Sequence, residues 1–177
     1  MKMNLIKSVL FVSVIFATAS CSSSDSQKKV EGNETNTKSE VVASAKTTKH
    51  IKIPGSSLYI IPPAGFIDNK TTGQLTKEYS NFMRMQMFGD YTPQKYFDEL
   101  KVQADKDFPG SWKEEKLTVD GHAASIYTYK TSAVIQYYLA FTDGYTDEMI
   151  IASFEETEME TGKEMYEALK TVVAEKS

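Results

Sequence analysis

Two Asp-Gly pairs, Asp120-Gly121 and Asp143-Gly144, divide a part of the chain that is rich in β-branched and aromatic residues. Asp-Gly is a strong signal for a tight hairpin turn, because glycine adopts positive φ angles without steric cost. The segments around these turns predict four consecutive strands, at 112–119, 123–130, 133–141 and 148–154. Since 148–154 is nearly all apolar, we expect it at the centre of a sheet, covered on both faces.

The first half of the chain predicts shorter elements. Strands are expected at 51–53, 58–61, 75–79 and 82–88, with a turn at 80–81. A helix should begin after Thr92, a good N-cap that is followed by proline, and end at Pro109-Gly110. A second helix is expected from a capping box at 161–164 to Val173. Together these elements predict an α+β fold, an antiparallel sheet of about six strands with two packed helices.

Residues 1–20 have the layout of a secretory signal peptide. A basic start that includes Lys2 precedes an apolar run at 9–17 and then the small residues Thr18-Ala19-Ser20. The run is shorter than the roughly 20 apolar residues that a transmembrane helix needs. Cys21 follows directly and is the only cysteine of the chain, which excludes an intramolecular disulfide and a cysteine-rich metal site.

The segment that ends at Cys21 resembles the lipobox of bacterial lipoproteins. That resemblance implies cleavage before Cys21, diacylation of its thiol, and attachment to the cell membrane or outer membrane on the exported side. Thr18 departs from the pattern, because lipoboxes usually carry a large aliphatic residue there. The alternative is a secreted protein that is cleaved near Ser20 and keeps a free thiol.

Composition separates the rest into a tether and a domain. Residues 21–49 contain no aromatic residue and are rich in Ser, Thr, Lys, Glu and Asn, which predicts a disordered tether. The globular domain is expected at 50–177. The formal charge is −4, and removal of residues 1–20 with their two lysines would leave about −6. This charge argues against a nucleic-acid partner, which favours basic surfaces.

Three segments of the domain are distinctive: Ser57–Phe66, with its Pro-Pro-Ala-Gly turn, the hairpin Leu117–Ala124, and the closing strand and helix Met149–Val173. These segments resemble the PsbP-like superfamily, which includes the PsbP subunit of photosystem II, the Ran-binding Mog proteins and the DcrB-like lipoproteins. The resemblance implies an α/β/α sandwich. It implies no shared activity, because these families work mostly as binding or assembly proteins.

Met83, Met85 and Met87 alternate along one predicted strand and are candidate metal ligands, with the acidic segment around 147–160 as the other candidate. Thioethers are soft ligands that suit Cu(I). Period-two spacing is also how a strand lines a core, and methionine fills cores well. The packing interpretation is favoured.

Catalytic groups are sparse in the sequence. His50 and His122 are its only histidines, and no pattern brings them together or beside a nucleophile. An acidic set is expected to form a solvated face: Asp147, Glu148, Glu155, Glu156, Glu158 and Glu160. We therefore expect no enzyme and no cofactor.

Aromatic residues recur on adjacent predicted strands: Tyr127, Tyr129, Tyr137, Tyr138 and Phe141. Tyr127 and Tyr129 share a face, as do Tyr137 and Phe141. The sequence leaves open whether they form a core or an exposed patch. These observations favour a non-enzymatic binding or accessory module of the bacterial envelope, held by lipid on Cys21, with a protein partner. The alternative is a small-ligand or metal-binding lipoprotein, with copper as the candidate metal.

Overall fold

A computed structural model of the chain describes residues 46–175. The predicted signal peptide, Cys21 and most of the predicted tether lie outside the described residues. The predicted start of the domain at residue 50 falls in the first described turn, where His50 N donates to Thr47 O at 3.1 Å. Nζ of Lys46 lies 3.4 Å from the centre of the Tyr59 ring. None of the helices in residues 46–175 has the length and apolarity needed to cross a membrane.

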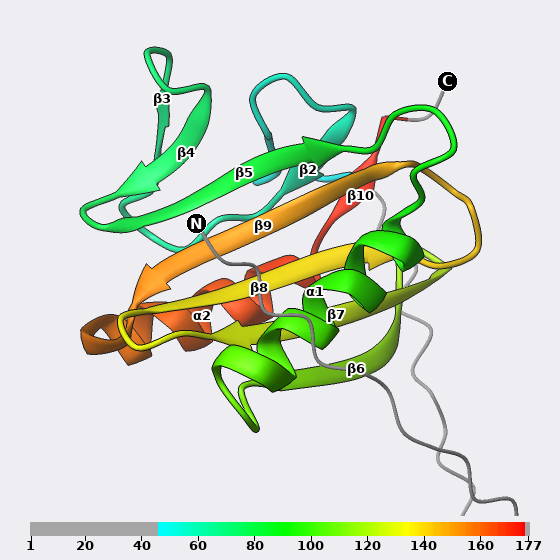
Figure 1. Cartoon of the computed structure of the whole chain (residues 1–177). Coiled ribbons are helices and arrows are strands. Elements are labelled where there is room, and N and C mark those ends of the chain that lie inside the picture. The colour runs from blue at the N-terminus through cyan, green and yellow to red at the C-terminus, as the bar shows by residue number, and fades with distance from the viewer. Residues whose placement is uncertain (1–45, 176–177) are drawn as a thin grey trace, which may run out of the picture. The chain divides into compact units, whose positions relative to one another are not determined.

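In the described part of the chain, the main sheet has seven strands in the order β3-β4-β5-β9-β8-β7-β6, and all neighbours are antiparallel (Figure 1). The strands are β3 (Ile67–Asn69), β4 (Gln74–Lys77), β5 (Ser80–Gln86), β6 (Trp112–Val119), β7 (His122–Lys130), β8 (Val134–Phe141) and β9 (Glu148–Glu155). The prediction of a central strand at 148–154 is confirmed, because β9 has three strands on either side.

The hairpin between β6 and β7 forms at Asp120-Gly121 as predicted. Both residues have positive φ, 51° and 83°, and Val119 pairs directly with His122. This is the two-residue turn that Asp-Gly favours. The β4–β5 turn differs from the prediction, because it lies at Glu78-Tyr79 instead of 80–81. The short strand β3 was not predicted, and the main sheet is therefore one strand larger than expected.

A second sheet of three strands joins the two ends of the domain. Its strands are β1 (Ile51–Lys52), β2 (Leu58–Ile60) and β10 (Val173–Ala174), in the order β1-β2-β10. Val173 pairs with Tyr59, so the prediction that the last helix continues to Val173 is wrong. After the helix the Thr171 hydroxyl donates to Ala168 O at 2.7 Å and accepts from Ile61 N at 2.9 Å, which connects this turn to the end of β2.

The first helix, α1 (Pro93–Asp107), begins as predicted, with the Thr92 side chain accepting from Lys95 N. The second, α2 (Met159–Leu169), begins before the predicted capping box, so that box is wrong. Its N-cap is Glu158, without a side-chain cap, and it follows the single 3-10 turn η1 (Glu156–Glu158). Gly162 lies inside the helix against Phe154, where a Cβ atom would come within 2.2 Å of the Phe154 ring.

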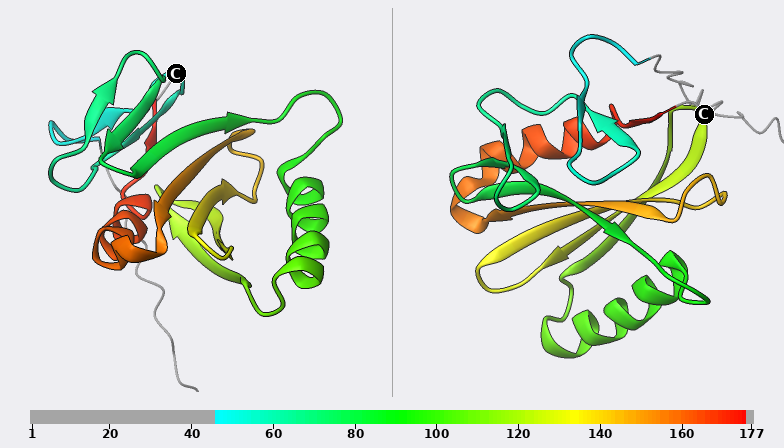
Figure 2. Two further views of the ribbon diagram at one scale, coloured as in Figure 1. Left: turned by 60° about the vertical axis from the view of Figure 1, so that its left-hand side comes forward. Right: turned by 90° about the horizontal axis from the view of Figure 1, so that it is seen from above.

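The two helices cover opposite faces of the main sheet (Figure 2). Alternate residues of one strand show this division: Ile126 belongs to the core beneath α2, whereas Tyr127 belongs to the core beneath α1. On the α2 side, the fully buried Met165 and Leu169 pack against the sheet, and each such side chain stabilises the fold by about 1.5–3 kcal/mol. The α+β class, with two helices on an antiparallel sheet, is thus confirmed.

Candidate functional site

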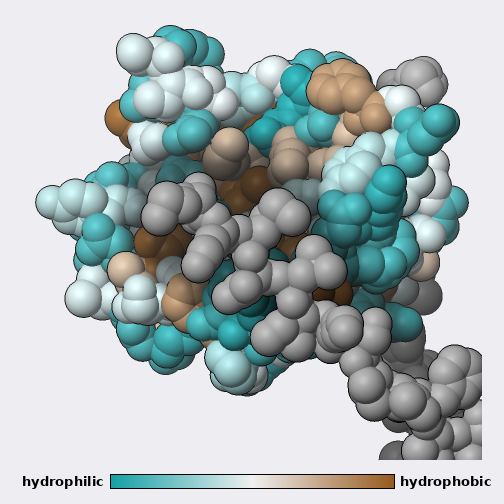
Figure 3. All heavy atoms as spheres, in the orientation of Figure 1, coloured by the Kyte–Doolittle hydropathy of each residue, from teal (hydrophilic) through white to brown (hydrophobic). Residues whose placement is uncertain are grey.

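The three predicted methionines lie on the α1 side of the sheet, Met83 and Met85 within β5 and Met87 directly after its end. Met87 is buried, while Met83 and Met85 are half-buried against the core beneath α1. Figure 3 shows apolar residues gathered on this face between β5 and α1, whose outer side is hydrophilic. Met149, which the sequence pattern did not single out, lies directly opposite Met85 on β9. All four methionines contribute to core packing, as the favoured interpretation predicted.

The two histidines have separate partners. His50 Nε2 lies 2.9 Å from Thr171 O, whereas His122 Nδ1 lies 3.0 Å from Asp143 Oδ2 and its ring stacks on Tyr145 at 3.4 Å. Burial alone would raise the pKa of the Asp143 carboxyl. Hydrogen bonds from His122 and from the backbone N–H groups of Tyr145 and Ala123 outweigh burial and lower the pKa. In residues 46–175, no three His, Cys, Asp or Glu side chains form a metal-binding group.

One member of the predicted acidic face is not solvated. Glu148 is only 8% exposed. Its Oε2 accepts hydrogen bonds from Ser56 Oγ and, at 2.9 and 3.1 Å, from the N–H and hydroxyl of Ser57. Its Oε1 lies 3.2 Å from Nε of Arg84. Glu148 therefore joins the loop before β2 to the main sheet, and the expectation of a solvated side chain is wrong for this residue.

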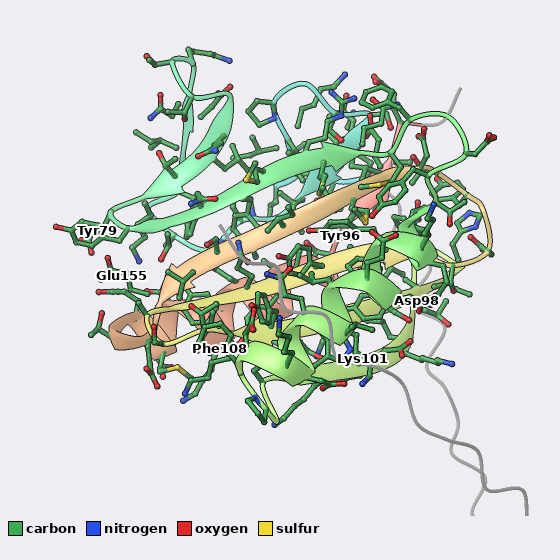
Figure 4. The ribbon with its side chains drawn as sticks, viewed as in Figure 1. Tyr79, Tyr96, Asp98, Lys101, Phe108 and Glu155 are labelled. Carbon is green, nitrogen blue, oxygen red and sulfur yellow. The ribbon has the colours of Figure 1, made fainter. Side chains whose placement is uncertain are left out.

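Most of the aromatic residues belong to the core. Tyr127 and Tyr129 are buried beneath α1, where the rings of Phe97 and Tyr127 stack at 3.8 Å. Figure 4 shows Tyr96 on this helix and Phe108 directly after its end, whereas Lys101 projects from the helix. On the other face Phe141 is buried, but Tyr137 is only partly covered. Tyr127 and Phe141 line a hollow of about 300 Å³ beside the start of α1, and Tyr137 lines a larger one on the α2 side.

The larger hollow, the α2 groove, lies between α2 and the strands β6, β7 and β8. It has a volume of about 580 Å³, within the range of small-ligand sites. Its lining residues are Lys113, Glu114, Glu115, Ile126, Thr128, Tyr137, Lys163, Tyr166 and Glu167. An aromatic and aliphatic floor therefore lies between two charged banks.

Tyr137 and Tyr166 determine the geometry of the α2 groove. Their rings meet edge to face, with centres 5.1 Å apart, and the Tyr137 ring also contacts that of Phe154, with centres 5.2 Å apart. The Tyr166 hydroxyl donates to Oε2 of Glu115, which ties α2 to the edge strand β6. Burial, with the Glu115 carboxylate next in importance, raises the pKa of Tyr166 well above its usual value. Tyr166 therefore stays a neutral hydrogen-bond donor.

Each bank of the α2 groove carries one lysine and one glutamate. Lys113 and Glu115 are two residues apart on β6, and so point to the same face of the sheet. Lys163 and Glu167 are four residues apart on α2, and so lie on one side of that helix. No sequence signal identifies this set, because its two halves are some 50 positions apart and meet only in the fold.

Another hollow, of about 490 Å³, adjoins the α2 groove. It lies between α2 and the Pro-Pro-Ala turn at 62–64, and Lys163 and Glu167 line it as well. These two side chains therefore form a ridge between the hollows. A ligand larger than the α2 groove can continue across this ridge.

No model of a known protein family matches the chain, and no curated protein sequence is significantly similar to it.

Proposed function

We propose that this protein is a lipid-anchored lipoprotein of the bacterial cell envelope that works as a non-enzymatic binding or accessory module. The α2 groove is the proposed binding surface, and a protein of the envelope is the proposed partner. The observation that carries the proposal is the groove itself: an aromatic floor at Tyr137 and Tyr166 between banks that hold charges of both signs. Aromatic anchors with a charged rim are typical of binding surfaces.

The chemistry of the lining favours binding over catalysis. Its described residues include no histidine, cysteine or serine, so the Ser-His or Cys-His pair that activates a nucleophile in many hydrolytic sites cannot form there. Of the two phenols in the lining, Tyr166, whose pKa is strongly raised by burial and by Glu115, donates to Glu115. A tyrosine held neutral in this way suits recognition better than proton abstraction.

The anchor is proposed from the sequence. Cys21 follows residues with the layout of a signal peptide, and it is the only cysteine of the chain. One acyl chain holds a protein to a membrane only marginally, whereas two hold it stably. A diacylated Cys21 would therefore be enough to retain the domain at the envelope.

We also propose that the domain is PsbP-like, with an α/β/α arrangement. Two helices on opposite faces of an antiparallel sheet support this, as do the turn at Pro62–Gly65 and the hairpin at Asp120-Gly121, which fall between strands as the resemblance implies. PsbP-like proteins are mostly binding proteins, which agrees with the proposed role.

The anchor is tested by fractionation of cells that express the full chain. The wild-type protein should sediment with membranes after a salt wash, and Cys21→Ala should move to the soluble fraction. A Cys21→Ala protein that still sediments with membranes would contradict the anchor. So would a wild-type protein in the cytosol with residues 1–20 still attached.

A second candidate function is binding of a soft metal such as Cu(I). The observation that favours it is the position of Met149 directly opposite Met85, beside Met83 and Met87 on one face. Cu(I) titration against a chromogenic chelator should show binding that Met85→Leu abolishes. Leucine has nearly the same volume, so this variant removes the thioether and keeps the packing. An unchanged titration would eliminate this candidate.

A further inference from the structure

The positive and negative side chains of the α2 groove lie at opposite ends of it. This arrangement follows from the directions in which β6, β8 and α2 run. β6 and β8 are both antiparallel to β7, so they run the same way. α2 follows β9 through the short η1 turn and runs back beside it, which makes α2 parallel to β8 and β6 (Figure 1). The hydrogen bond from Tyr166 to Glu115 sets the register between the two banks.

This common direction places the two lysines at one end and the two glutamates at the other. Lys113 precedes Glu115 by two strand residues, about 6.6 Å. Lys163 precedes Glu167 by four helix residues, about 6 Å. On both banks the backbone positions of the lysine and the glutamate are therefore separated by nearly the same distance, in the same sense.

The charges at the groove remain available for a ligand. Lys163 pairs with Glu160, and Glu167 pairs with Lys170, whose Nζ also lies 4.8 Å from the centre of the Tyr166 ring. These are exposed pairs on the helix surface, where such pairs are weak, so a ligand amine at this end would replace Lys170. Within residues 46–175 Lys113 forms no ion pair. Glu114, the remaining acidic lining residue, bonds through its side chain to Ser125.

The floor of the groove complements the acidic end. The Tyr166 ring lies beside Glu115, and Tyr137 meets it edge to face. Aromatic faces attract organic cations, and the attraction adds to that of a carboxylate. Ile126 supplies apolar surface between the two charged ends. A ligand with an amine, an apolar middle and a carboxylate would satisfy all three parts.

Building on the proposed binding role, we propose that the α2 groove binds a short peptide zwitterion of about two residues. Its amine lies at the Glu115 and Glu167 end, and its carboxylate lies between Lys113 and Lys163. Length sets the size: an extended chain spans at most about 3.3–3.6 Å per residue, so two residues match the separation of the charges. A free amino acid is too short to reach both ends.

Calorimetric titration of the purified full-length protein in detergent tests this ligand class. The probes are the dipeptide Ala-Phe, its N-acetylated and C-amidated forms, and free phenylalanine. Ala-Phe should bind best, and loss of either terminal charge should weaken binding about tenfold, as expected for a charge-assisted hydrogen bond. Equal binding of capped and uncapped forms, or no binding of Ala-Phe tighter than about 10 mM, would overturn the proposal.

Matched variants separate recognition from folding. Lys163→Gln should weaken binding of Ala-Phe about tenfold and leave binding of the C-amidated form unchanged, because that form lacks the carboxylate. Lys101→Gln, on α1 at the other face of the sheet, should change neither. If Lys163→Gln affects both forms equally, the assigned orientation is wrong. If dipeptides fail to bind, only the proposed ligand class is overturned. Binding of a partner protein at the groove is measured by a separate experiment, photo-cross-linking in cells from position 163.

Discussion

Nε of Arg84 lies 3.2 Å from Oε1 of Glu148, and Arg84 is the only arginine of the chain. The other carboxylate oxygen of Glu148 accepts three hydrogen bonds from the loop at Ser56 and Ser57. Since this loop leads into β2, one buried carboxylate connects the small sheet to β5 and β9 of the main sheet.

Glu148→Ala should therefore destabilise the protein by about 3 kcal/mol, in the range observed when one partner of a buried ion pair is removed. The substitution leaves Arg84 without its carboxylate and two serines without their acceptor. Urea denaturation measures the loss, and Glu155→Ala, at an exposed end of the same strand, is the control and should change stability little. A loss below about 1 kcal/mol would show that the cluster is not a structural connection.

Gly162→Ala should also destabilise the protein, although alanine is the better helix former by about 1 kcal/mol. The reason is contact: the new Cβ atom would lie 2.2 Å from the Phe154 ring. We expect a net loss of about 2 kcal/mol, measured by thermal or urea unfolding. Adding Phe154→Leu should recover part of the loss. Gly162→Ala with unchanged or higher stability would contradict the packing of α2 on β9.

Phe97 and Val102 offer a matched pair on α1. Phe97 is 2% exposed and stacks on Tyr127, whereas Val102 is 72% exposed. Phe97→Ala should cost about 3–5 kcal/mol, and Val102→Ala should stay within about 0.5 kcal/mol. Equal effects in urea unfolding would mean that α1 does not pack on the sheet through Phe97.

Asp143 should contribute a pH-dependent term to stability. Hydrogen bonds lower its pKa in the folded protein below its ordinary value of 3.8. The contribution is therefore present above that pH and lost as the pH falls through the lower, folded-state value. Asp143→Asn should be less stable than wild type at about pH 6, and the difference should shrink at about pH 3. An equal difference at both pH values would contradict the interaction with His122.

The sequence predicted the local elements well where a short motif determines them. Asp120-Gly121 formed the expected hairpin, and Thr92 capped the expected helix. The start of α2 was mispredicted because Thr161 and Glu164 fit a capping box, whereas packing of Gly162 on Phe154 places these residues within the helix. β10 could not be found from two residues, because its strand character comes from pairing with β2, over 100 positions away.

The candidate site was less predictable than the fold. Lys113 and Glu115 looked like ordinary charged residues of an edge strand, and Lys163 and Glu167 like the solvated side of a helix. Only the Tyr166–Glu115 hydrogen bond and the parallel course of β6 and α2 bring them into one groove. Glu148 was likewise counted with its acidic neighbours, because its partners Ser56 and Arg84 are remote in sequence.

Site-specific photo-cross-linking in living cells tests the central claim most directly. The photoreactive residue p-benzoylphenylalanine replaces Lys163 on the ridge of the α2 groove or, as a control, Lys101 on α1. We predict a discrete protein adduct from position 163, none from position 101, and loss of the adduct when Tyr166→Ala is added. The same adducts from both positions, or none from position 163, would contradict a binding role for the α2 groove.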